Sequence, residues 1–568
     1  MKFRKILSVL VILALITGMF VGCGNTTSDN KIEDKGTVAA NGDDTDESKV
    51  PEEEKEPQIL RLTTTADIPS LDCSISTDQS SFEVLGNTVE GLFRLGKGDV
   101  AENALVESYE TSEDGMHWTF HLRKDSVWSN GTPVTAHDFE YSWKRLANPD
   151  TGAQYAFFIE TAGLANATKV TKGEMDVDDL GVKATDDYTL ELTLDIPVPF
   201  LKGVLAFPSF DPINKEFCES KGEAYGTSIE NMIFNGPFVL SDWETEYEYR
   251  LTKNENYYDK DSVTLDAVNF RIVKDANTTL NLYEAGEIDV VGLVGEQIEQ
   301  YEDHPHLLKA ARSSVWYLQL NQEDEIFQNK NARKAFAMAI DKSFVTDEIL
   351  ANGAMVADYL VPRGLAASPV DGSDFRATAG LYNSFDAPKA SDYWEKAKEE
   401  LGIETAEIEF LASDSETGRR IAEYIQGQLQ GNLEGLTATI DQQPFKNRLA
   451  LQDSGDFDFS LAGWGPDYGD PMTFLDMWTT ESGHNVIAYS NPEYDKIIQR
   501  TKMGDLTSDL ATRWTELQRA EQILLEEDVA LVPVFQSGAM LLKKPNLKGF
   551  DRHQFAPDYS YKDVYFEK

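Results

Sequence analysis

Cysteine and positive charge are both scarce in this chain. Only three of its 568 residues are cysteines, which excludes a small scaffold held together by many disulfide bonds. Lysine and arginine number 51 against 98 aspartates and glutamates, so the formal net charge is −47. Affinity for nucleic acid comes from clustered Lys and Arg side chains that release counterions from phosphates. The composition therefore argues against nucleic acid as a partner.

The sequence also lacks the short motifs that mark common catalytic and nucleotide-binding sites. It contains no GxxxxGK[ST] loop, no GxGxxG after a strand, no HExxH and no GxSxG. Its seven histidines are scattered, and the proline between His304 and His306 keeps that close pair off a single helical face. We therefore expect no enzyme, no metal and no cofactor. A secreted hydrolase is the alternative from another class, but it needs a nucleophile and a base that the sequence does not reveal.

The length and the aromatic content predict a folded protein with more than one packed unit. A single hydrophobic core stops growing near about 250–300 residues, so 568 residues predict at least two units. Residues 59–65 have the β-branched composition of a strand. Residues 116–122 alternate, with Trp118, Phe120 and Leu122 on one face, which also predicts a strand.

Helical patterns are interleaved with these strands. Thr135 to Asp138 has the form of a capping box, and Phe139, Trp143 and Leu146 give the following helix an apolar stripe that should end at Asn148. Further strands are expected at 189–194 and 268–273, and further helices at 331–350 and 391–401. No repeat of 20–50 residues is visible, which excludes a solenoid or propeller. The pattern predicts a mixed α/β fold (α+β) in two or more lobes.

The first 22 residues have the organisation of a signal peptide. Basic residues at positions 2, 4 and 5 precede an apolar run from Ile6 to Val21 that is shorter than a bilayer span. The following Gly22-Cys23 completes a tetrapeptide with Phe20 and Val21 that resembles a bacterial lipobox, in which the cysteine becomes diacylated. Phe20 departs from the usual leucine. We expect cleavage before Cys23 and lipidation of Cys23, with a plain secretory signal as the alternative.

An acidic segment separates this cysteine from the folded body. Residues 24–57 hold eleven acidic and four basic residues and no aromatic residue. Such a segment cannot bury enough apolar surface to offset its chain entropy, so residues 23–57 are expected to form a lipidated, disordered tether. With Cys23 lipidated, Cys73 and Cys218 are left as an even pair. The sequence is consistent with a disulfide between them and with two buried thiols.

Longer blocks of sequence carry a resemblance to a known family. In chain order they are 104–109 (ALVESY), 118–124 (WTFHLRK), 128–136 (WSNGTPVTA), 141–145 (YSWKR), 235–237 (NGP), 254–257 (NENY), 285–289 (AGEID), 335–342 (AFAMAIDK), 463–471 (GWGPDYGDP) and 532–534 (VPV). From Leu60 to Lys568 the chain thereby resembles the extracellular solute-binding proteins of family 5, the oligopeptide-binding proteins of ABC importers.

This resemblance implies two lobes with a ligand cleft between them, in a fold like that of periplasmic binding proteins. The first lobe would have an extra subdomain, and the chain would cross between lobes near Ser314 and Gln536, which would form the hinge. The implied boundaries are 58–89, 235–313 and 537–568 for subdomain I of the first lobe, 90–234 for its subdomain II, and 314–536 for the second lobe.

The resemblance also implies a set of peptide-binding residues. Asp467, in the Gly-Trp-x-x-Asp-Tyr motif, would pair with the α-amine of a bound peptide, because a desolvated ammonium needs a carboxylate partner. Trp464 and Gly465 would offer a strand edge to the peptide backbone. The remaining implied contacts are Tyr155, Trp316, Tyr317, Phe445, Thr77, Asp78 and Gln79. An aromatic residue at any of these positions could equally serve only the core.

One expected partner of the peptide is missing from its usual place. Some members carry an arginine two residues before the Gly-Trp, where it is available for the peptide's C-terminal carboxylate, and this chain has Leu461. Arg419 or Arg448 could take over that contact. Without it, the family pattern would suit longer or open-ended peptides.

Together the motifs predict a lipid-anchored, monomeric receptor that captures oligopeptides and delivers them to the permease subunits of an ABC importer, whose cytoplasmic ATPases supply the energy. We expect it at the extracytoplasmic face of the cell membrane of a Gram-positive bacterium. Within the same family, the alternative ligand is a signalling or murein peptide or another small solute.

Overall fold

The structure is a computed structural model that describes residues 56–198, 200–507 and 509–568. The expected signal peptide, Cys23 and almost all of the expected tether lie outside the described residues. Residues Glu56–Lys568 form one compact unit. None of the helices in the described ranges combines the length and the apolar character that a membrane crossing needs.

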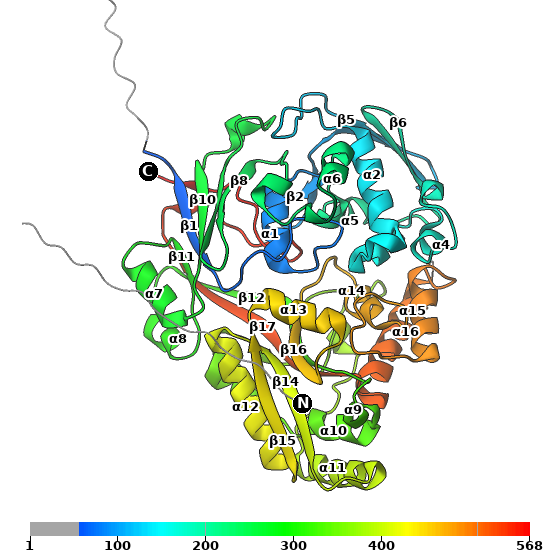
Figure 1. Cartoon of the computed structure of the whole chain (residues 1–568), viewed down its shortest axis with the longest axis vertical. Coiled ribbons are helices and arrows are strands. Elements are labelled where there is room, and N and C mark those ends of the chain that lie inside the picture. Colours follow the sequence, from blue (N-terminus) through cyan, green and yellow to red (C-terminus); the bar gives the residue numbers. More distant parts are fainter. Residues whose placement is uncertain (1–55, 199, 508) are drawn as a thin grey trace, which may run out of the picture. The chain divides into compact units, whose positions relative to one another are not determined.

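A four-stranded sheet joins the start of the folded body to a segment far along the chain (Figure 1). Strand β1 (Ile59–Thr64) runs parallel to β10 (Ala267–Ile272), and β9 (Glu248–Lys253) and β8 (Phe238–Glu244) continue the sheet in antiparallel order. The strands expected at 59–65 and 268–273 are confirmed, with ends that differ by one residue.

A second four-stranded sheet is wholly antiparallel. Its order is β4 (Val106–Thr111), β5 (His117–Leu122), β7 (Thr189–Thr193) and β6 (Val182–Asp186). Phe120 and Leu122 are buried, as the alternating pattern predicted, whereas Trp118 is only half-buried. The strands expected at 116–122 and 189–194 are confirmed.

Helix α2 (Ala136–Ala147) packs against β6 and β7 and shows why its sequence forms a helix. The Asp138 carboxylate accepts the backbone N–H of Thr135 at 2.8 Å, which closes the expected capping box. Phe139, Trp143 and Leu146 are fully buried. The helix ends before Asn148, as predicted.

The largest sheet of the described residues has seven strands. In sheet order they are β11 (Val290–Gly292), β17 (Leu531–Lys543), β12 (Leu307–Leu320), β16 (Phe459–Trp464), β14 (Ala406–Ser413) and β15 (Leu436–Gln443), with β13 (Met355–Val356) paired to β17. Strands β14 and β15 run parallel, and so do β14 and β16. Helix α12 (Glu416–Asn432) packs on β14 and β15, beside them in Figure 1.

The two helices expected around this sheet differ from the prediction, the first by a break in its middle and the second at its start. The helix expected at 331–350 is divided into α10 (Lys330–Met338) and a separate π-helical turn, Val345–Leu350. The Asp341 carboxylate accepts hydrogen bonds from the N–H and the hydroxyl of Ser343. These bonds form a turn between the two helical segments. Helix α11 (Ala387–Leu401) begins earlier than expected because Asp386 caps it by accepting the N–H of Lys389.

The pairing between the long strands β12 and β17 is interrupted at the place where the chain was expected to cross between lobes. Their pairing shifts register between Ala311 and Val315, opposite Gln536. The Gln536 amide oxygen accepts the Tyr359 hydroxyl and the Arg363 N–H, each at 2.9 Å. Its nitrogen donates to the carbonyls of Arg312 and Arg363, each at 3.0 Å. All four hydrogen-bonding positions of this buried amide are therefore used at the interruption.

Apolar packing divides into two large cores and a smaller one in the described residues. The second core is built from residues within 318–461 and 529–535. The first core draws mainly on residues 60–270 but also contains Tyr468, Trp478 and Tyr494, from the segment expected in the second lobe. Packing is thus continuous across the expected cleft, and the lobe boundaries stay a prediction.

The two cysteines that the sequence left open are both free and buried. The Cys73 thiol donates to the carbonyl of Asp211 at 3.7 Å. Of the two alternatives, the structure contains the pair of buried thiols.

Candidate functional site

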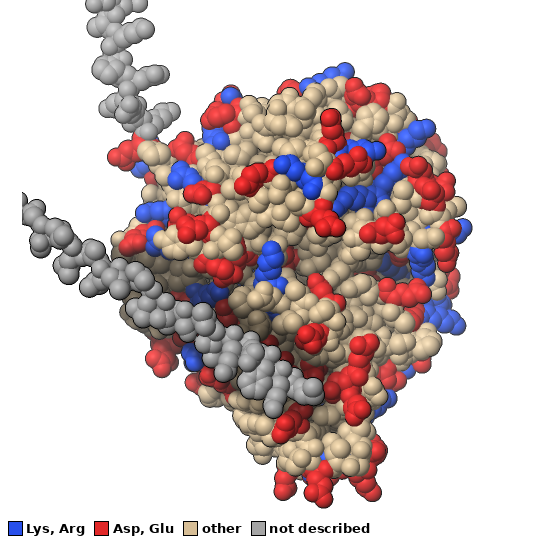
Figure 2. Space-filling model, in the orientation of Figure 1, with Lys and Arg blue, Asp and Glu red and all other residues tan. Residues whose placement is uncertain are grey.

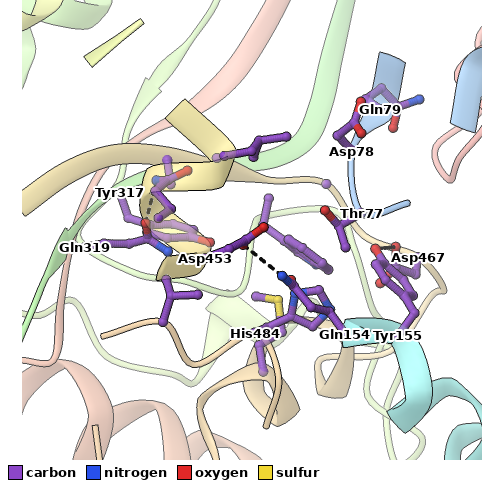
Figure 3. A pocket seen from close by; sticks show the side chains of 18 of the residues that line it. Thr77, Asp78, Gln79, Gln154, Tyr155, Tyr317, Gln319, Asp453, Asp467 and His484 are labelled. Atoms are coloured by element: carbon purple, nitrogen blue, oxygen red, sulfur yellow. Dashed lines mark hydrogen bonds between the residues drawn. The ribbon is translucent and has the colours of Figure 1, made fainter. Parts of the chain in front are cut away.

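A cavity of about 240 Å³, lined by both polar and apolar groups, gathers most of the residues that the resemblance implied (Figure 3). Its wall is drawn from segments that lie far apart in the sequence: 77–82, 154–155, 316–319, 445–453, 462–467, 477–486 and Ala556. The implied residues that line it are Thr77, Asp78, Gln79, Tyr155, Trp316, Tyr317, Phe445, Arg448, Trp464, Gly465 and Asp467. Their roles as ligand contacts stay predictions.

Asp467 is a buried carboxylate at this cavity, with only hydroxyl groups as side-chain partners. It follows strand β16 in the loop that leads to helix α14 (Met472–Leu475) and is 6% exposed. Its carboxylate accepts the Tyr155 hydroxyl at 3.1 Å and the Thr473 hydroxyl at 3.4 Å. Within the described residues no Lys or Arg nitrogen lies within 4.0 Å of it. Burial raises the pKa of Asp467 well above its usual range, and no cation lies close enough to oppose that shift.

The loop that carries Asp467 is anchored away from the cavity. Both oxygens of the Asp470 carboxylate accept from the Arg513 guanidinium, at 2.8 and 2.9 Å. The Asp467 N–H donates to the Thr473 hydroxyl at 2.9 Å. These bonds fix the backbone on both sides of Asp470, so the carboxylate of Asp467 is held in place before a ligand arrives.

An aromatic wall flanks this carboxylate. The Tyr155 ring stacks on Trp464, with centroids 6.0 Å apart and planes 20° apart. His484 meets both rings edge-on, at 5.0 Å from Tyr155 and 4.9 Å from Trp464. Burial lowers the pKa of His484 to about 3, so its imidazole is neutral. The indole Nε1 of Trp464 and the Nε2 of His484 have no hydrogen-bond partner within the described residues.

Strand β16 offers the cavity an incompletely paired edge. Residues Val315–Leu320 of β12 pair with all of β16 on one side. On the other side, within the described strands, β14 pairs only with Phe459 and Ser460. Trp316 lies opposite Gly463, and a Cβ on that glycine would come within 2.7 Å of the indole ring. The absence of a side chain at Gly463 therefore lets the Trp316 ring lie against the strand.

Amide and hydroxyl groups form another part of the cavity wall. The Gln452 amide donates to Gln319 at 2.7 Å and to the Ser460 hydroxyl at 2.8 Å. In Figure 3, Gln154 reaches across to the Asp453 carboxylate, a hydrogen bond of 2.8 Å, while neighbouring Tyr155 reaches Asp467. Sequence reasoning missed these glutamines, Asp453 and His484. They carry no motif, and only the fold brings them together.

The two candidate arginines lie in different places. Arg448, on helix α13 (Phe445–Ser454), lines the cavity and is 5% exposed. Arg419 lies on the outer face of α12, half-exposed, with its guanidinium 3.3 Å from Glu423 one turn later. Arg419 does not line the cavity, because the apolar face of α12 packs on the sheet and turns the charged face outward. The structure thus separates Arg419 from the other implied site residues.

Thr77, Asp78 and Gln79 enter the cavity wall at the start of helix α1 (Gln79–Thr88). The Asp78 carboxylate caps the helix by accepting the Ser81 N–H at 2.9 Å and the Ser81 hydroxyl at 2.7 Å. Burial raises the pKa of Asp78 to about 6. The capping bonds give Asp78 a structural role that sequence alone did not distinguish from ligand binding.

Polar contacts in and beside the cavity connect residues 154–160 to residues 453–502. Besides the Gln154–Asp453 and Tyr155–Asp467 bonds, Lys502 at the end of α15 (Pro492–Lys502) reaches helix α3 (Phe157–Thr161). Its ammonium donates to the Phe157 carbonyl at 3.3 Å and lies 3.8 Å from the Glu160 carboxylate and 3.2 Å from that of Asp476. These contacts hold the two walls of the cavity together.

Within the described residues, no three His, Cys, Asp or Glu side chains come together in a way that could hold a metal ion. The cavity itself contains carboxylates, amides, aromatic rings and one arginine. This arrangement is suited to binding a polar ligand with both donor and acceptor groups.

Solved structures with the same fold cover almost all of the folded body. The substrate-binding domain of an oligopeptide ABC transporter from Bacillus anthracis is 44% identical, with a TM-score of 0.87, and covers 90% of this chain and 99% of that chain. OppA of Listeria monocytogenes bound to peptide is 40% identical, with a TM-score of 0.86 and the same coverage. Both comparisons support the mixed α/β, two-lobed fold.

Two structures of one relative distinguish between conformations. The murein tripeptide-binding protein MppA of Escherichia coli, 27% identical, superposes with a TM-score of 0.80 over 90% of this chain and 99% of that chain. Its unliganded open form, also 27% identical, superposes with a TM-score of only 0.53 over 90% of this chain and 98% of that chain. The arrangement of the present chain therefore differs from that open form, in agreement with the polar contacts across the cavity.

The family follows from the sequence comparisons. The family model for bacterial extracellular solute-binding proteins, family 5 Middle, matches residues 101–485. The dipeptide-binding protein DppE of Bacillus subtilis (strain 168) is 33% identical over 87% of this chain and 90% of its own length. The chain therefore belongs to family 5 of the bacterial extracellular solute-binding proteins.

Proposed function

We propose that this protein is a receptor that captures short peptides outside the cell through their free α-amine and passes them to an ABC importer. The carrying observation is the buried Asp467 carboxylate, which has hydroxyl partners and no cation. A bound ammonium would supply the missing charge, and the charge-assisted hydrogen bonds that it makes are about twice as strong as neutral ones. The ammonium would either replace the Tyr155 hydroxyl as a donor to the Asp467 carboxylate or donate to that carboxylate together with it.

The peptide backbone has a matching surface on β16. Because the edge beyond Ser460 is not paired to β14, an extended ligand can add its own N–H and C=O groups there. Such main-chain contacts are indifferent to side chains, which suits a receptor for peptides of varied sequence. The relatives are named as dipeptide-binding and oligopeptide ABC transporter proteins, and the Listeria protein carries a peptide in its structure, which supports the same ligand class here.

Attachment and delivery complete the proposal. Lipidation of Cys23 would keep the receptor at the extracytoplasmic face of a Gram-positive membrane, and the acidic segment 24–57 would give it reach toward the permease. The protein acts as a monomer that binds without chemical change of the ligand. The permease subunits and their ATPases carry out the transport.

Calorimetry on the purified protein with a defined mixture of tripeptides, followed by mass spectrometry of the recovered ligands, tests the central claim. We expect saturable binding and intact peptides. N-acetylated versions of the same peptides should bind at least about 30-fold more weakly, because acetylation removes the charge that Asp467 needs. Hydrolysed peptides, or equal binding of free and acetylated forms, would refute the proposal.

A further inference from the structure

Two buried carboxylates line a small cavity that shares no lining residue with the candidate ligand site. Glu90 lies between helix α1 and strand β2 (Phe93–Leu95), and Asp211 follows the short helical turn Pro208–Phe210. The two residues are 3% and 5% exposed, and the cavity that they border has a volume of about 20 Å³. Since about 10–15 Å³ is enough for one water-sized particle, the cavity has room for a single small occupant.

One oxygen of the Glu90 carboxylate has partners and the other has none. Oε2 accepts the Tyr257 hydroxyl at 2.9 Å and lies 3.7 Å from the Arg94 guanidinium. Oε1 is fully buried and has no hydrogen-bond partner within the described residues. Arg94 therefore offsets the charge of Glu90 but leaves Oε1 without a partner.

Asp211 has no cation beside it to offset its charge. In the described ranges no Lys or Arg nitrogen lies within 4.0 Å of its carboxylate, and its Oδ2 is fully buried without a hydrogen-bond partner. Burial and the negative charge of Glu90 raise the pKa of Asp211 well above its usual range. An isolated buried charge is costly, so this group of two carboxylates and one guanidinium lacks one positive charge.

Gly91 leaves space for an occupant among further oxygen atoms. The position that a Cβ would take there lies 2.9 Å from Asp211 Oδ1, 3.4 Å from the Phe93 carbonyl oxygen and 3.9 Å from the Leu205 carbonyl oxygen. The φ of Gly91 is not positive, so its backbone alone would accept alanine. Carboxylate and carbonyl oxygens are the ligands that hard cations prefer.

We infer that this cavity binds one alkali-metal cation, held by the carboxylates of Glu90 and Asp211 and by backbone carbonyl oxygens beside Gly91. One such ion neutralises the group and contacts several oxygens at once. A water molecule would leave the charge in place, and a proton on Asp211 would serve only one further acceptor. Calcium takes about six to eight oxygen ligands and would overcompensate the charge. The inference is independent of the proposed function, and it departs from the sequence-based expectation of no metal because two acidic residues far apart in the chain form no motif.

The cation would connect three segments that line the cavity, namely 86–95, 206–211 and 557–560. Anything that binds only the folded state stabilises it, so occupancy should raise the melting temperature. Because the candidate ligand site is lined by other residues, occupancy should leave the affinity for peptides unchanged.

Thermal melts of the full chain at constant ionic strength test the inference. N-methyl-D-glucamine chloride, whose cation is too large for the cavity, is replaced stepwise by sodium chloride or by potassium chloride. The melting temperature should rise by at least about 1 °C with one or both salts and level off as the site fills. The salt that acts at the lower concentration identifies the preferred ion. Equal melting temperatures in all three salts, or a rise with calcium chloride alone, would overturn the inference.

Variants attribute the response to the cavity. Asp211→Asn should abolish it and, in N-methyl-D-glucamine chloride, should melt at or above the temperature of the wild type, because an unpaired buried charge is removed. Gly91→Ala, whose methyl group would fill the space beside Asp211, should also abolish the response. Gly203→Ala is the matched control, since open space surrounds that glycine, and it should respond like the wild type. An undiminished response in Asp211→Asn would show that the ion binds elsewhere.

A crystal of the wild type grown with thallium(I) acetate, in place of sodium and potassium salts, provides a measurement that needs no variant. Thallium(I) occupies alkali-cation sites and scatters X-rays anomalously. We expect an anomalous peak in contact with Glu90 Oε1 and Asp211 Oδ2, and the absence of a peak there would contradict the inference even if both variants fail to fold. Peptide binding is measured separately, so failure of this inference leaves the proposed function intact.

Discussion

Asp467 combines two properties that rarely persist together in a folded protein, namely deep burial and the absence of a nearby cation. Hydroxyl groups stabilise an ionised carboxylate only in part, so the free site favours the protonated form. An arriving ammonium reverses this preference, because an opposite charge at hydrogen-bonding distance lowers the pKa of the carboxyl group. Ligand binding and deprotonation of Asp467 are therefore coupled.

Asp467→Asn should weaken the binding of an unmodified tripeptide by about 2–5 kcal/mol, because the ligand ammonium would be buried without its counter-charge. Calorimetry measures the change. Asp392→Asn, at an exposed position of helix α11 outside the cavity, is the matched control and should leave both the affinity and the melting temperature unchanged. Equal affinity of wild type and Asp467→Asn would show that this carboxylate does not bind the ligand.

Glu83 makes the free energy of unfolding depend on pH. It is a buried residue of α1 whose carboxyl group accepts the Tyr561 hydroxyl, and burial raises its pKa to about 8. In the unfolded chain the group ionises near about pH 4.3, so between these values the folded state binds more protons. The contribution of Glu83 to stability is therefore complete below about pH 4.3 and is lost as the pH rises toward 8.

Glu83→Gln should flatten the fall in melting temperature between pH 5 and pH 8, since glutamine stays neutral throughout. The measurement is a series of thermal melts at constant ionic strength. Glu107→Gln, at an exposed position of β4, should reproduce the slope of the wild type. Parallel slopes for wild type and Glu83→Gln would contradict the assignment.

At this scale, a local motif predicted residues that the structure places at the cavity, and their roles in ligand binding stay predictions. Asp467 and Trp464 were identified from the Gly-Trp-x-x-Asp-Tyr pattern, and the cavity contains both. Gln154, Asp453 and His484 were missed because they gain their positions only from long-range contacts, such as the Gln154–Asp453 bond. Arg448 and Arg419 could not be distinguished, since choosing between them required knowing which face of each helix meets the cavity.

At the scale of elements, strand β16 places several parts of the site at once. One side of the strand pairs with β12 and brings Trp316 against Gly463, while the carbonyl of Leu461 holds Arg448. The end of the same strand leads into Asp467. A change that displaces the strand should therefore alter binding more than it alters global stability.

Gly463→Ala tests this dependence. The added methyl group would come within 2.7 Å of the Trp316 indole, which also stacks on Phe535, so the ring must move. We expect at least about a tenfold loss of peptide affinity, with about 1–3 kcal/mol lost from the free energy of unfolding. Gly427→Ala is the control: it lies on α12 with open space around it and should leave affinity unchanged. Retention of affinity in Gly463→Ala would contradict the argument.

The elements themselves were largely predictable because their signals are local. Residues 116–122 and the stripe of Phe139, Trp143 and Leu146 predicted a strand and a helix that the structure contains. The division between α10 and the turn at 345–350 was not predicted. The bond from Asp341 to Ser343 competes with continuation of the helix, and side-chain capping of this kind leaves the apolar periodicity unchanged.

At the scale of the whole molecule, surface charge and conformation depend on different groups of residues. Acidic side chains outnumber basic ones over the face shown in Figure 2, and they gather at its lower end over α11. A net charge of this size favours solubility, and its attraction for cationic ligands is weak and screened by salt. The two sides of the cavity, by contrast, are connected by a few polar contacts, among them the ion pair of Lys502 with Glu160.

Lys502→Met should loosen this connection in the ligand-free protein. We expect a larger radius of gyration by small-angle X-ray scattering without ligand and the wild-type value at saturating peptide, since a ligand that touches both walls favours their approach. Lys496→Met, at an exposed position on the same helix α15, should scatter like the wild type. Identical scattering of Lys502→Met and wild type without ligand would show that these contacts do not set the conformation.

The fold as a whole was predictable from the resemblance, but the continuous apolar packing across the expected cleft was not. The expected crossings near Ser314 and Gln536 coincide with the interruption between β12 and β17. The first core nevertheless extends into residues expected in the second lobe, such as Trp478. The sequence alone does not reveal which residues of the two lobes pack against each other.

Strand β17 lies inside the largest sheet, second in its order, and this place has a consequence for biosynthesis. This strand, Leu531–Lys543, lies between β11 and β12, whose residues are synthesised more than two hundred positions earlier. The order of synthesis therefore leaves a gap in the sheet until the C-terminal segment is available, and contacts this distant in sequence form slowly. A chain that is still attached to the ribosome cannot complete this sheet, so the protein stays incompletely folded until nearly all of it has been made.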